Sequence, residues 1–158
     1  MGHPRKEFMQ SAIREALKAK QRGENAVGAI IVREDQLLAR AYNSTMKKRD
    51  PLYHAEVVAI QKACRSLKSK YLENCWLYTT HEPCPMCASL MVWAKLEGVV
   101  FGAQWDDMMG ASYFADGKQF PWRTIAISSE EVFQKSEPHK PKLIQGFMRE
   151  ECMKLFRV

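Results

Sequence analysis

The sequence has no long hydrophobic run. None of its apolar segments approaches the roughly 18–20 residues that a membrane-spanning helix needs. The opening segment, MGHPRKEFMQ, places no apolar core behind its charges, so it does not predict a secretory signal peptide. We therefore expect a cytoplasmic protein with no membrane partner.

Cysteine is also scarce. The chain has five cysteines, an odd number, and no export signal accompanies them. This pattern does not suit a disulfide scaffold and favours metal binding or catalysis. The sequence also lacks internal repeats and low-complexity tracts, and its 158 residues suit one domain of ordinary size. We therefore expect a single domain over residues 1–158.

The charge is unevenly distributed along the chain. Residues 1–70 contain 15 basic and 7 acidic residues, a net charge of +8, whereas residues 71–158 carry a net charge of −2. A basic half attracts polyanions such as nucleic acid, but a solvated surface of a soluble protein can carry the same charge. Composition alone leaves both interpretations open.

Apolar periodicity predicts the secondary structure. Helical spacing of apolar residues predicts helices over 6–21, 54–67, 83–95 and 148–156. Short apolar runs predict strands over 26–32, 37–42, 75–80, 99–101 and 124–127, the first two as a hairpin. The segments predicted to be loops include 43–53 and 102–123. Because strands alternate with helices, the predicted fold class is α/β, with helices covering both faces of a sheet.

Three candidate zinc ligands stand at two predicted helix starts. His54 begins one helix, and Cys84 and Cys87 begin another, directly after Pro83. Zinc prefers tetrahedral nitrogen and sulfur ligands, and a catalytic zinc needs three protein ligands and one open position. Two cysteines with two residues between them can point at one ion, and the amides of a helix N-terminus stabilise their thiolates. The spacing therefore predicts one catalytic Zn²⁺ per chain.

Glu56 is the candidate catalytic acid–base group. It lies two residues after His54 and need not be a ligand. From the first helical turn it can reach water at the metal, take a proton from it, and pass protons to a ring nitrogen and a leaving amine. Hydrolytic deamination requires this arrangement, and the combined pattern H-x-E…P-C-x-x-C is the signature of zinc deaminases. A structural zinc site or a redox dithiol fits the pattern less well.

At these motifs the sequence resembles the cytidine/deoxycytidylate deaminase-like zinc enzymes, and it looks closest to bacterial tRNA adenosine deaminases and guanine deaminases. The resemblance covers about residues 8–102, resumes weakly near 146–156, and includes the segments VGAIIV, DPLYHAEVVAI, LYTTHEPCPMCASLM and VVFGA. It implies a three-layer α/β/α fold with a mixed five-stranded sheet, usually assembled as a dimer. It also implies that His54, Cys84 and Cys87 bind zinc and that Glu56 carries protons.

Other residues are candidates for substrate contacts. Asn43 matches a family asparagine that hydrogen-bonds the substrate base, but it also suits a turn at the end of a strand. Tyr53 departs from both subfamilies and either forms part of the pocket wall, stacks on a base, or simply packs. Asp106 and Asp107 follow a strand near the expected pocket mouth, where they accept hydrogen bonds from guanine or form a solvated turn. His81 is also unusual, and it either touches substrate or is a satisfied structural histidine.

Several substrates remain open among the deaminases. The wobble adenosine of the tRNA anticodon loop, converted to inosine, is the lead, because Lys47, Lys48 and Arg49 place a basic triplet on the loop before His54. Free guanine, converted to xanthine, is the alternative. Another free purine, or a pyrimidine base or nucleoside, ranks below it.

A non-enzymatic alternative is a zinc-stabilised nucleic-acid-binding module. Its stacking surfaces would be the aromatic residues Trp105, Phe114, Phe120 and Trp122. Glu56 discriminates against this alternative, because a closed structural zinc site needs a fourth protein ligand and has no use for Glu56.

The helix predicted over 83–95 is more apolar than one packed face requires. The helix has more large apolar side chains than one packed face can bury, namely Leu90, Met91 and Trp93. We therefore expect a homodimer or larger assembly in which apolar helix faces pack together.

Overall fold

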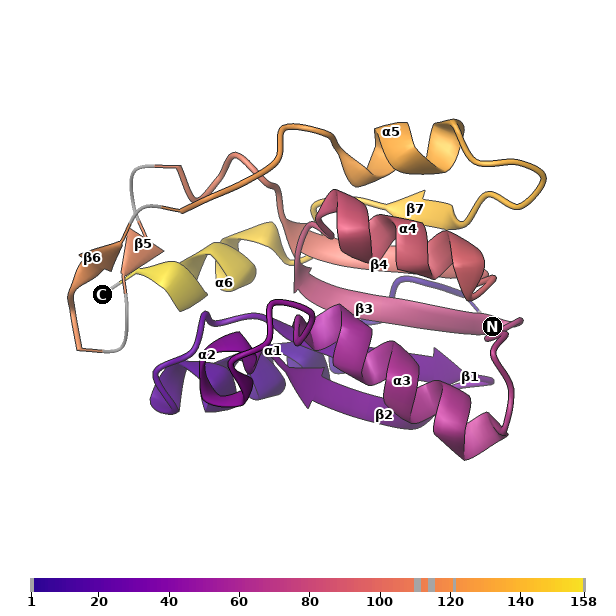
Figure 1. Cartoon of the computed structure of the whole chain (residues 1–158), viewed down its shortest axis with the longest axis horizontal. Coiled ribbons are helices and arrows are strands. Elements are labelled where there is room, and N and C mark those ends of the chain that lie inside the picture. Colours follow the sequence, from indigo (N-terminus) through magenta and orange to yellow (C-terminus); the bar gives the residue numbers. More distant parts are fainter. Residues whose placement is uncertain (1, 110–111, 114–115, 121, 158) are drawn as a thin grey trace.

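The computed structural model describes residues 2–109, 112–113, 116–120 and 122–157, and its framework is a five-stranded sheet with helices on both faces (Figure 1). The helices are α1 (Lys6–Gln21), α2 (Thr45–Lys48), α3 (Ala55–Leu67), α4 (Pro85–Trp93), α5 (Ser129–Gln134), α6 (Arg149–Met153) and the 3₁₀ helix η1 (Lys154–Phe156). The strands are β1 (Gly28–Arg33), β2 (Gln36–Tyr42), β3 (Cys75–His81), β4 (Gly98–Ala103), β5 (Ser112–Tyr113), β6 (Gln119–Phe120) and β7 (Lys142–Ile144). None of the helices in the described ranges has both the length and the apolar character needed to cross a membrane.

The sheet is mixed, with strand order β2-β1-β3-β4-β7. β1 pairs antiparallel with β2 and with β3, whereas β3, β4 and β7 run parallel. β2 therefore runs in the same direction as β3, and the carboxyl ends of β2, β3, β4 and β7 meet at one edge of the sheet. Ligand sites of open α/β sheets form at this edge. A separate two-stranded ribbon pairs β5 with β6.

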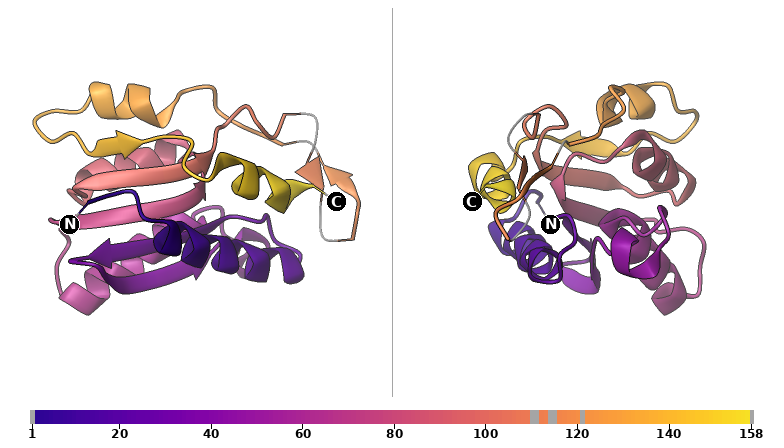
Figure 2. Two further views of the ribbon diagram at one scale, coloured as in Figure 1. Left: turned by 180° about the vertical axis from the view of Figure 1, so that it is seen from behind. Right: turned by 60° about the vertical axis from the view of Figure 1, so that its left-hand side comes forward.

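The helices form two outer layers around the sheet (Figure 2). α1 packs on β1, β2 and β3, and α6 packs on β4; on the opposite face α3 packs on β1 and β2, and α4 packs against α3 and α5. Because side chains alternate along a strand, neighbouring residues divide between the two cores. Ile30 and Tyr78 belong to the core under α1, whereas Ile31 and Leu77 belong to the core under α3. This arrangement confirms the predicted three-layer α/β/α fold.

Close packing fixes the start of β1 beside the end of β3. A Cβ at Gly28 would overlap the carbonyl oxygen of Ala12 in α1, so the helix can approach the strand only because this residue is glycine. The Gly28 amide also donates to the buried Thr80 hydroxyl at 3.1 Å. The amino end of β1 is thereby held at the edge where the other four strands end.

The fifth strand is a correction to the prediction from sequence. Residues 124–127 form no strand; Ile125 and Ile127 are 61% and 43% exposed and line a cavity. The fifth strand is instead β7, which has only three residues in a segment rich in lysine and proline. An apolar signal that short does not stand out from its surroundings.

Two helices were also not predicted. α2 has four residues and α5 has six, so each is shorter than two helical turns. Helices of this length are stabilised by tertiary contacts rather than by their own periodicity. They nevertheless matter here, because both lie next to the candidate site.

Candidate active site

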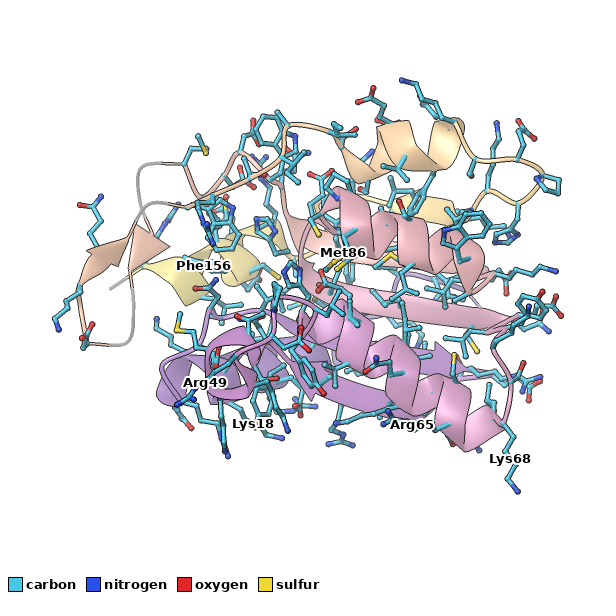
Figure 3. All side chains as sticks on the ribbon, viewed as in Figure 1. Lys18, Arg49, Arg65, Lys68, Met86 and Phe156 are labelled. Carbon is cyan, nitrogen blue, oxygen red and sulfur yellow. The ribbon has the colours of Figure 1, made fainter. Side chains whose placement is uncertain are left out.

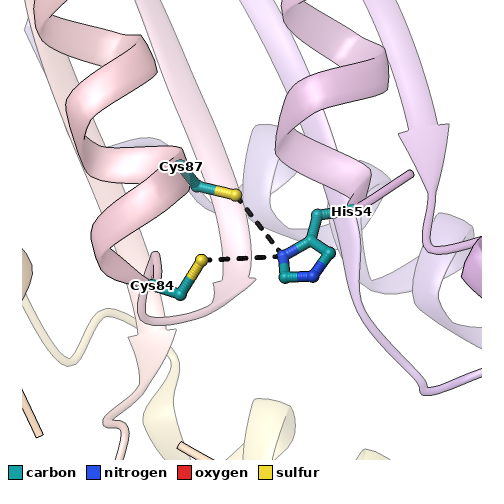
Figure 4. Close-up of side chains that lie close together, drawn as sticks. All are labelled: His54, Cys84 and Cys87. Carbon is teal, nitrogen blue, oxygen red and sulfur yellow. Dashed lines mark hydrogen bonds between the residues drawn. The ribbon is translucent and has the colours of Figure 1, made fainter. Parts of the chain in front are cut away.

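The three predicted zinc ligands meet at the carboxyl edge of the sheet (Figure 4). α3 follows β2 and α4 follows β3, so both helices begin at this edge. His54 is the extended residue before α3, and Cys84 is the extended residue before α4. Cys87 lies in the first turn of α4, which Pro85 opens without loss of a backbone hydrogen bond. The two helix N-termini therefore direct their ligands to one place.

The spacing of the donor atoms fits zinc. His54 Nδ1 lies 3.5 Å from Cys87 Sγ and 3.7 Å from Cys84 Sγ. A tetrahedral ion with a Zn–N distance of about 2.05 Å and a Zn–S distance of about 2.3 Å separates such atoms by about 3.6 Å. Among the described residues, no fourth His, Cys, Asp or Glu joins this group. The cluster therefore leaves one coordination position for water or substrate.

The surroundings of the cluster favour a thiolate at Cys84. Hydrogen bonds from Cys87 and His54 lower the pKa of Cys84 to about 4, against the effect of burial. The same contact with Cys84 raises the pKa of His54. Cys87 is buried and donates to Cys84, so its pKa is raised in the metal-free cluster. The N-terminus of α4 adds a partial positive charge that further stabilises sulfur anions and so prepares the site for a cation.

Glu56 lies beside the cluster in the first turn of α3. Its side chain is buried, and the Thr79 hydroxyl of β3 donates to its Oε1 at 3.4 Å. Burial raises the pKa of Glu56 to about 7, and the nearby His54 opposes this shift. A carboxyl group poised near neutrality can both accept and release a proton, which is what acid–base catalysis needs.

These groups open into a cavity of about 530 Å³. This volume lies within the range of about 300–1,000 Å³ that is typical of small-molecule sites. His54, Glu56 and Cys84 form its polar end. Much of the remaining wall is aromatic or aliphatic and includes Val27, Met86, Trp105, Trp122, Ile125 and Ile127. The cavity therefore suits a flat ligand. Its apolar wall can pack against the faces of the ligand, and its polar end can bind a metal.

The structure brings Asn43 to this cavity but not Tyr53. Asn43 is buried in the wall, where its Nδ2 lies 3.5 Å from the Thr45 hydroxyl. Tyr53 precedes His54 in the chain but is not part of the cavity wall. Its ring instead packs under Lys48, whose Nζ lies 5.6 Å from the ring centroid.

Asp106 and Asp107 also lie outside the cavity wall. Asp107 forms an ion pair with Arg149 of α6, and its Oδ2 accepts the Gln104 amide at 2.7 Å. The hydrogen-bonded Arg149 guanidinium lowers the pKa of Asp107. Asp106 is exposed to solvent. Asp107 therefore ties the turn after β4 to the C-terminal helix, a role that tertiary contacts alone reveal.

The predicted basic triplet lies in the chain between two residues of the cavity wall. Lys47 and Lys48 end α2, Arg49 follows in the left-handed conformation, and all three side chains are exposed; Figure 3 shows Arg49. Thr45 and Pro51, on either side of the triplet, line the cavity. The exposed basic turn is therefore joined to the cavity wall at both of its ends.

Buried Glu24 anchors this basic turn. Its two carboxylate oxygens accept the backbone amides of Lys47 and Met46, at 2.8 and 3.1 Å. These amides belong to the first turn of α2, where backbone donors have no partner within the helix. A single distant carboxylate thus takes the place of a local helix cap.

His81 supports the aromatic wall of the cavity. Its Nδ1 donates to the Glu82 carbonyl at 3.0 Å, and its ring packs against Trp122 with a centroid distance of 4.7 Å. Burial lowers the pKa of His81 to about 4, so the ring is neutral at physiological pH. Within the described part of the chain, its Nε2 has no hydrogen-bond partner.

Two charged residues of the cavity wall, Glu82 and Arg123, belong to none of the candidate sites predicted from the sequence. Arg123 lies in the wall beside Trp122. It stands in a segment without hydrophobic periodicity and belongs to no motif, so no sequence signal could have identified it. Phe114 and the side chain of Phe120, which were candidates for stacking surfaces, lie outside the described residues.

The fold has three layers, and its cavity ends on this histidine–cysteine cluster and a buried glutamate. Together these features define a zinc-dependent deaminase. The chain belongs to a known family, because the model of the cytidine and deoxycytidylate deaminase zinc-binding region matches residues 3–103. This range ends with β4 and contains the whole cluster together with Glu56. Membership favours an enzyme over the non-enzymatic binding module.

Similarity extends to individual relatives. The chain is 49% identical over 96 residues to a tRNA-specific adenosine deaminase of Aquifex aeolicus, covering 61% of this chain and 64% of that relative, which is just under two thirds. It is 41% identical over 86 residues to a guanine deaminase of Bacillus subtilis, covering 54% and 55%. A solved structure from a study of A-to-I editing by tRNA:A34 deaminases has a TM-score of 0.78 and 30% identity, covering 96% of this chain and 99% of that one.

The geometry predicts one zinc per chain. Cys87→Ala removes one of only three ligands and should abolish stoichiometric zinc binding. Cys64→Ala, which removes a half-buried cysteine outside the cluster, should keep it. Metal analysis of gently purified protein by mass spectrometry measures both. A parent protein holding far less than one zinc, or a Cys87 variant that retains it, would contradict the assignment.

Proposed function

We propose that this chain is a single-domain, zinc-dependent deaminase that converts the wobble adenosine of tRNA to inosine and releases ammonia. The observation that carries the proposal is the exposed basic turn 47–49, whose neighbours Thr45 and Pro51 line a cavity that ends on the zinc cluster and Glu56. An RNA base presented to a catalytic metal needs both a deep site for the base and cations for its phosphates. Similarity over nearly the whole chain to a structure studied for tRNA:A34 deamination supports the same substrate.

In this proposal His54, Cys84 and Cys87 hold the zinc, which supplies the Lewis acidity that activates water for attack on C6 of adenine. Glu56 moves the protons. Its carboxylate takes a proton from the attacking water, gives it to the ring nitrogen, and then helps the amino group to leave as ammonia. The Thr79 hydroxyl lies between the Glu56 carboxylate, at 3.4 Å from Oε1, and the His81 carbonyl oxygen, at 3.2 Å.

Asn43 and the aromatic wall orient the base. The carboxamide of Asn43 offers both a donor and an acceptor to the edge of the ring. Trp105 and Trp122 present aromatic surface in the wall, and stacking of a base on such surface stabilises binding by about 1–3 kcal/mol. A base turned out of the RNA stack, as deaminases of nucleic acids require, would be held in this way.

Free guanine is the second candidate substrate, and the 41% identity with a guanine deaminase of Bacillus subtilis favours it. Asp106 and Asp107, which the sequence suggested as contacts for guanine, lie outside the cavity wall, and this supports the tRNA substrate over guanine. An ammonia-release assay with tRNA containing adenosine at position 34, guanine, adenine, cytosine and their nucleosides tests the two candidates. Activity on guanine alone would place the protein in purine metabolism instead of tRNA processing.

We also propose a homodimer. An apolar groove of about 960 Å³ runs between α3 and α4, with Leu52 and Trp93 beside it at 54% and 77% exposure. The sequence of α4, PMCASLMVW, contains no charged residue. A helix that is apolar on all sides favours burial against another surface. A second copy of the chain, presenting the same face, would cover it.

A cytoplasmic location follows from the proposed substrate. All five cysteines are free, which agrees with a reducing compartment. Translation uses tRNA in that compartment, so enzyme and substrate would meet there.

Glu56→Ala should keep zinc and fold but lose turnover by a factor of at least about 10²–10⁴, because a positioned acid–base group contributes that much to the rate. Glu56→Gln, which keeps the shape of the side chain, should lose activity to a similar extent. Single-turnover deamination and zinc content are measured on the same samples. Full activity of either variant on an accepted substrate would remove Glu56 from the mechanism.

Changing Lys47, Lys48 and Arg49 together to Ala should raise the KM for tRNA strongly and flatten its salt dependence, because three phosphate contacts are lost. The zinc content should not change. A matched control changes Lys135, Lys140 and Lys142 to Ala, which removes the same charge from exposed positions in the segment between α5 and β7 and at the start of β7. The proposal fails if the two triple variants respond alike, or if the parent deaminates guanine and leaves tRNA untouched.

Trp93→Glu should convert the dimer to a monomer, because it places a charge on the apolar groove. Leu17→Glu is the control, since Leu17 is 44% exposed on α1, which covers the opposite face of the sheet. Light scattering at micromolar concentration gives the mass of each variant. A monomeric parent protein would end the dimer proposal.

A further inference from the structure

The buried carboxylate of Glu82 has no part in the mechanism above. Glu82 lies two residues before Cys84, is 5% exposed and lines the cavity. Three uncharged donors converge on it. The Trp105 amide donates to Oε2 at 3.0 Å, and the amide and the hydroxyl of Ser129 donate to Oε1, each at 3.1 Å.

These hydrogen bonds join the two ends of the segment that connects β4 to α5. Trp105 lies just after β4, and Ser129 is the first residue of α5. Between them the chain forms the β5–β6 ribbon and returns along the cavity as the wall from Trp122 to Ile127. Ser129 is fully buried, and α5 packs on α4. One carboxylate therefore holds Trp105 and Ser129, the residues on either side of the described wall residues 122–127.

The same residue is attached to the zinc-ligand turn. The Glu82 amide donates to the Ala103 carbonyl at 2.7 Å, and the chain continues directly through Pro83 to Cys84. On its other side, His81 donates to the Glu82 carbonyl and packs against Trp122. Glu82 is thus the place where the cavity wall and the metal ligands are joined.

The donors around Glu82 suit a side chain with two acceptor oxygens. A carboxylate presents only acceptors, which matches three donors. Glutamine at this position would present one oxygen and one NH₂ group, so at least one amide of Trp105 or Ser129 would face another donor. Hydrogen bonds to a charged group are also stronger than neutral ones.

We propose that Glu82 is a positioning residue. It holds the cavity wall formed by Trp105 and residues 122–127 against the zinc-ligand turn, and it thereby determines how tightly the cavity binds the substrate base. This inference rests on the proposed function for its substrate. Loosening the wall should weaken binding of the base more than it slows the chemistry. The reason is that Glu56 and the zinc ligands keep their own contacts in β3, α3 and α4.

Glu82→Gln tests this proposal, in a Trp93→Phe background that removes the 77% exposed tryptophan. Because Trp76 is buried, acrylamide quenching of fluorescence then reports mainly on Trp105 and Trp122. We expect stronger quenching, an unchanged zinc content, and a KM raised about tenfold or more, the effect of losing a hydrogen bond to a charged group. The change in kcat should be the smaller of the two.

Two further variants make the test decisive. Ser129→Ala removes only the hydroxyl bond, so it should shift quenching and KM in the same direction but less, and it carries the test if the Glu82 variant does not fold. Glu130→Gln makes the same substitution at an exposed position next to Ser129, and it should leave quenching, zinc content and KM unchanged.

Unchanged quenching and KM in both Glu82→Gln and Ser129→Ala would overturn the proposal. So would a joint loss of zinc and kcat at constant KM, which would assign Glu82 to the metal turn alone. If the parent protein deaminates neither tRNA nor guanine, the proposed function fails. Quenching and zinc content then still decide the role of Glu82.

Discussion

A tetrahedral zinc needs three donor atoms about 3.6 Å apart, and the rest of this structure depends on that constraint. His54 and Cys84 come from different parts of the chain, and each stands just before a helix. They meet because β2 and β3 run in the same direction on either side of the antiparallel β1, so that α3 and α4 begin at one edge of the sheet. The hairpin and the close packing of α1 on Gly28 maintain this strand order.

Three buried glutamates at this edge have different hydrogen-bond donors around them. Glu24 accepts two amides of α2 and holds the basic turn. Glu82 accepts three donors and holds the cavity wall. Glu56 has a single hydroxyl donor at 3.4 Å and a pKa raised to about 7 by burial. Satisfied carboxylates serve as structural anchors, whereas the poorly satisfied one can exchange protons.

α4 combines two tasks that both depend on its apolar sequence. Its N-terminus carries the two cysteines, and its sides face the core and the groove beside Trp93. Met86, at the start of the helix, borders both the cavity and this groove (Figure 3). A second copy bound in the groove would therefore lie next to the catalytic cavity, so that assembly and substrate access share one helix.

The α/β class, the helix over 6–21, the zinc cluster and the candidate acid–base residue could all be predicted from the sequence, because they depend on local periodicity and on short motif spacing. The sequence could not locate β7 or α5, which are too short to show a period and exist through packing. Only the tertiary structure decided that Asp107 pairs with Arg149 and that Glu82 closes the cavity wall. Such contacts join residues far apart in the chain, and no local pattern of side chains encodes which distant donors will meet a buried carboxylate.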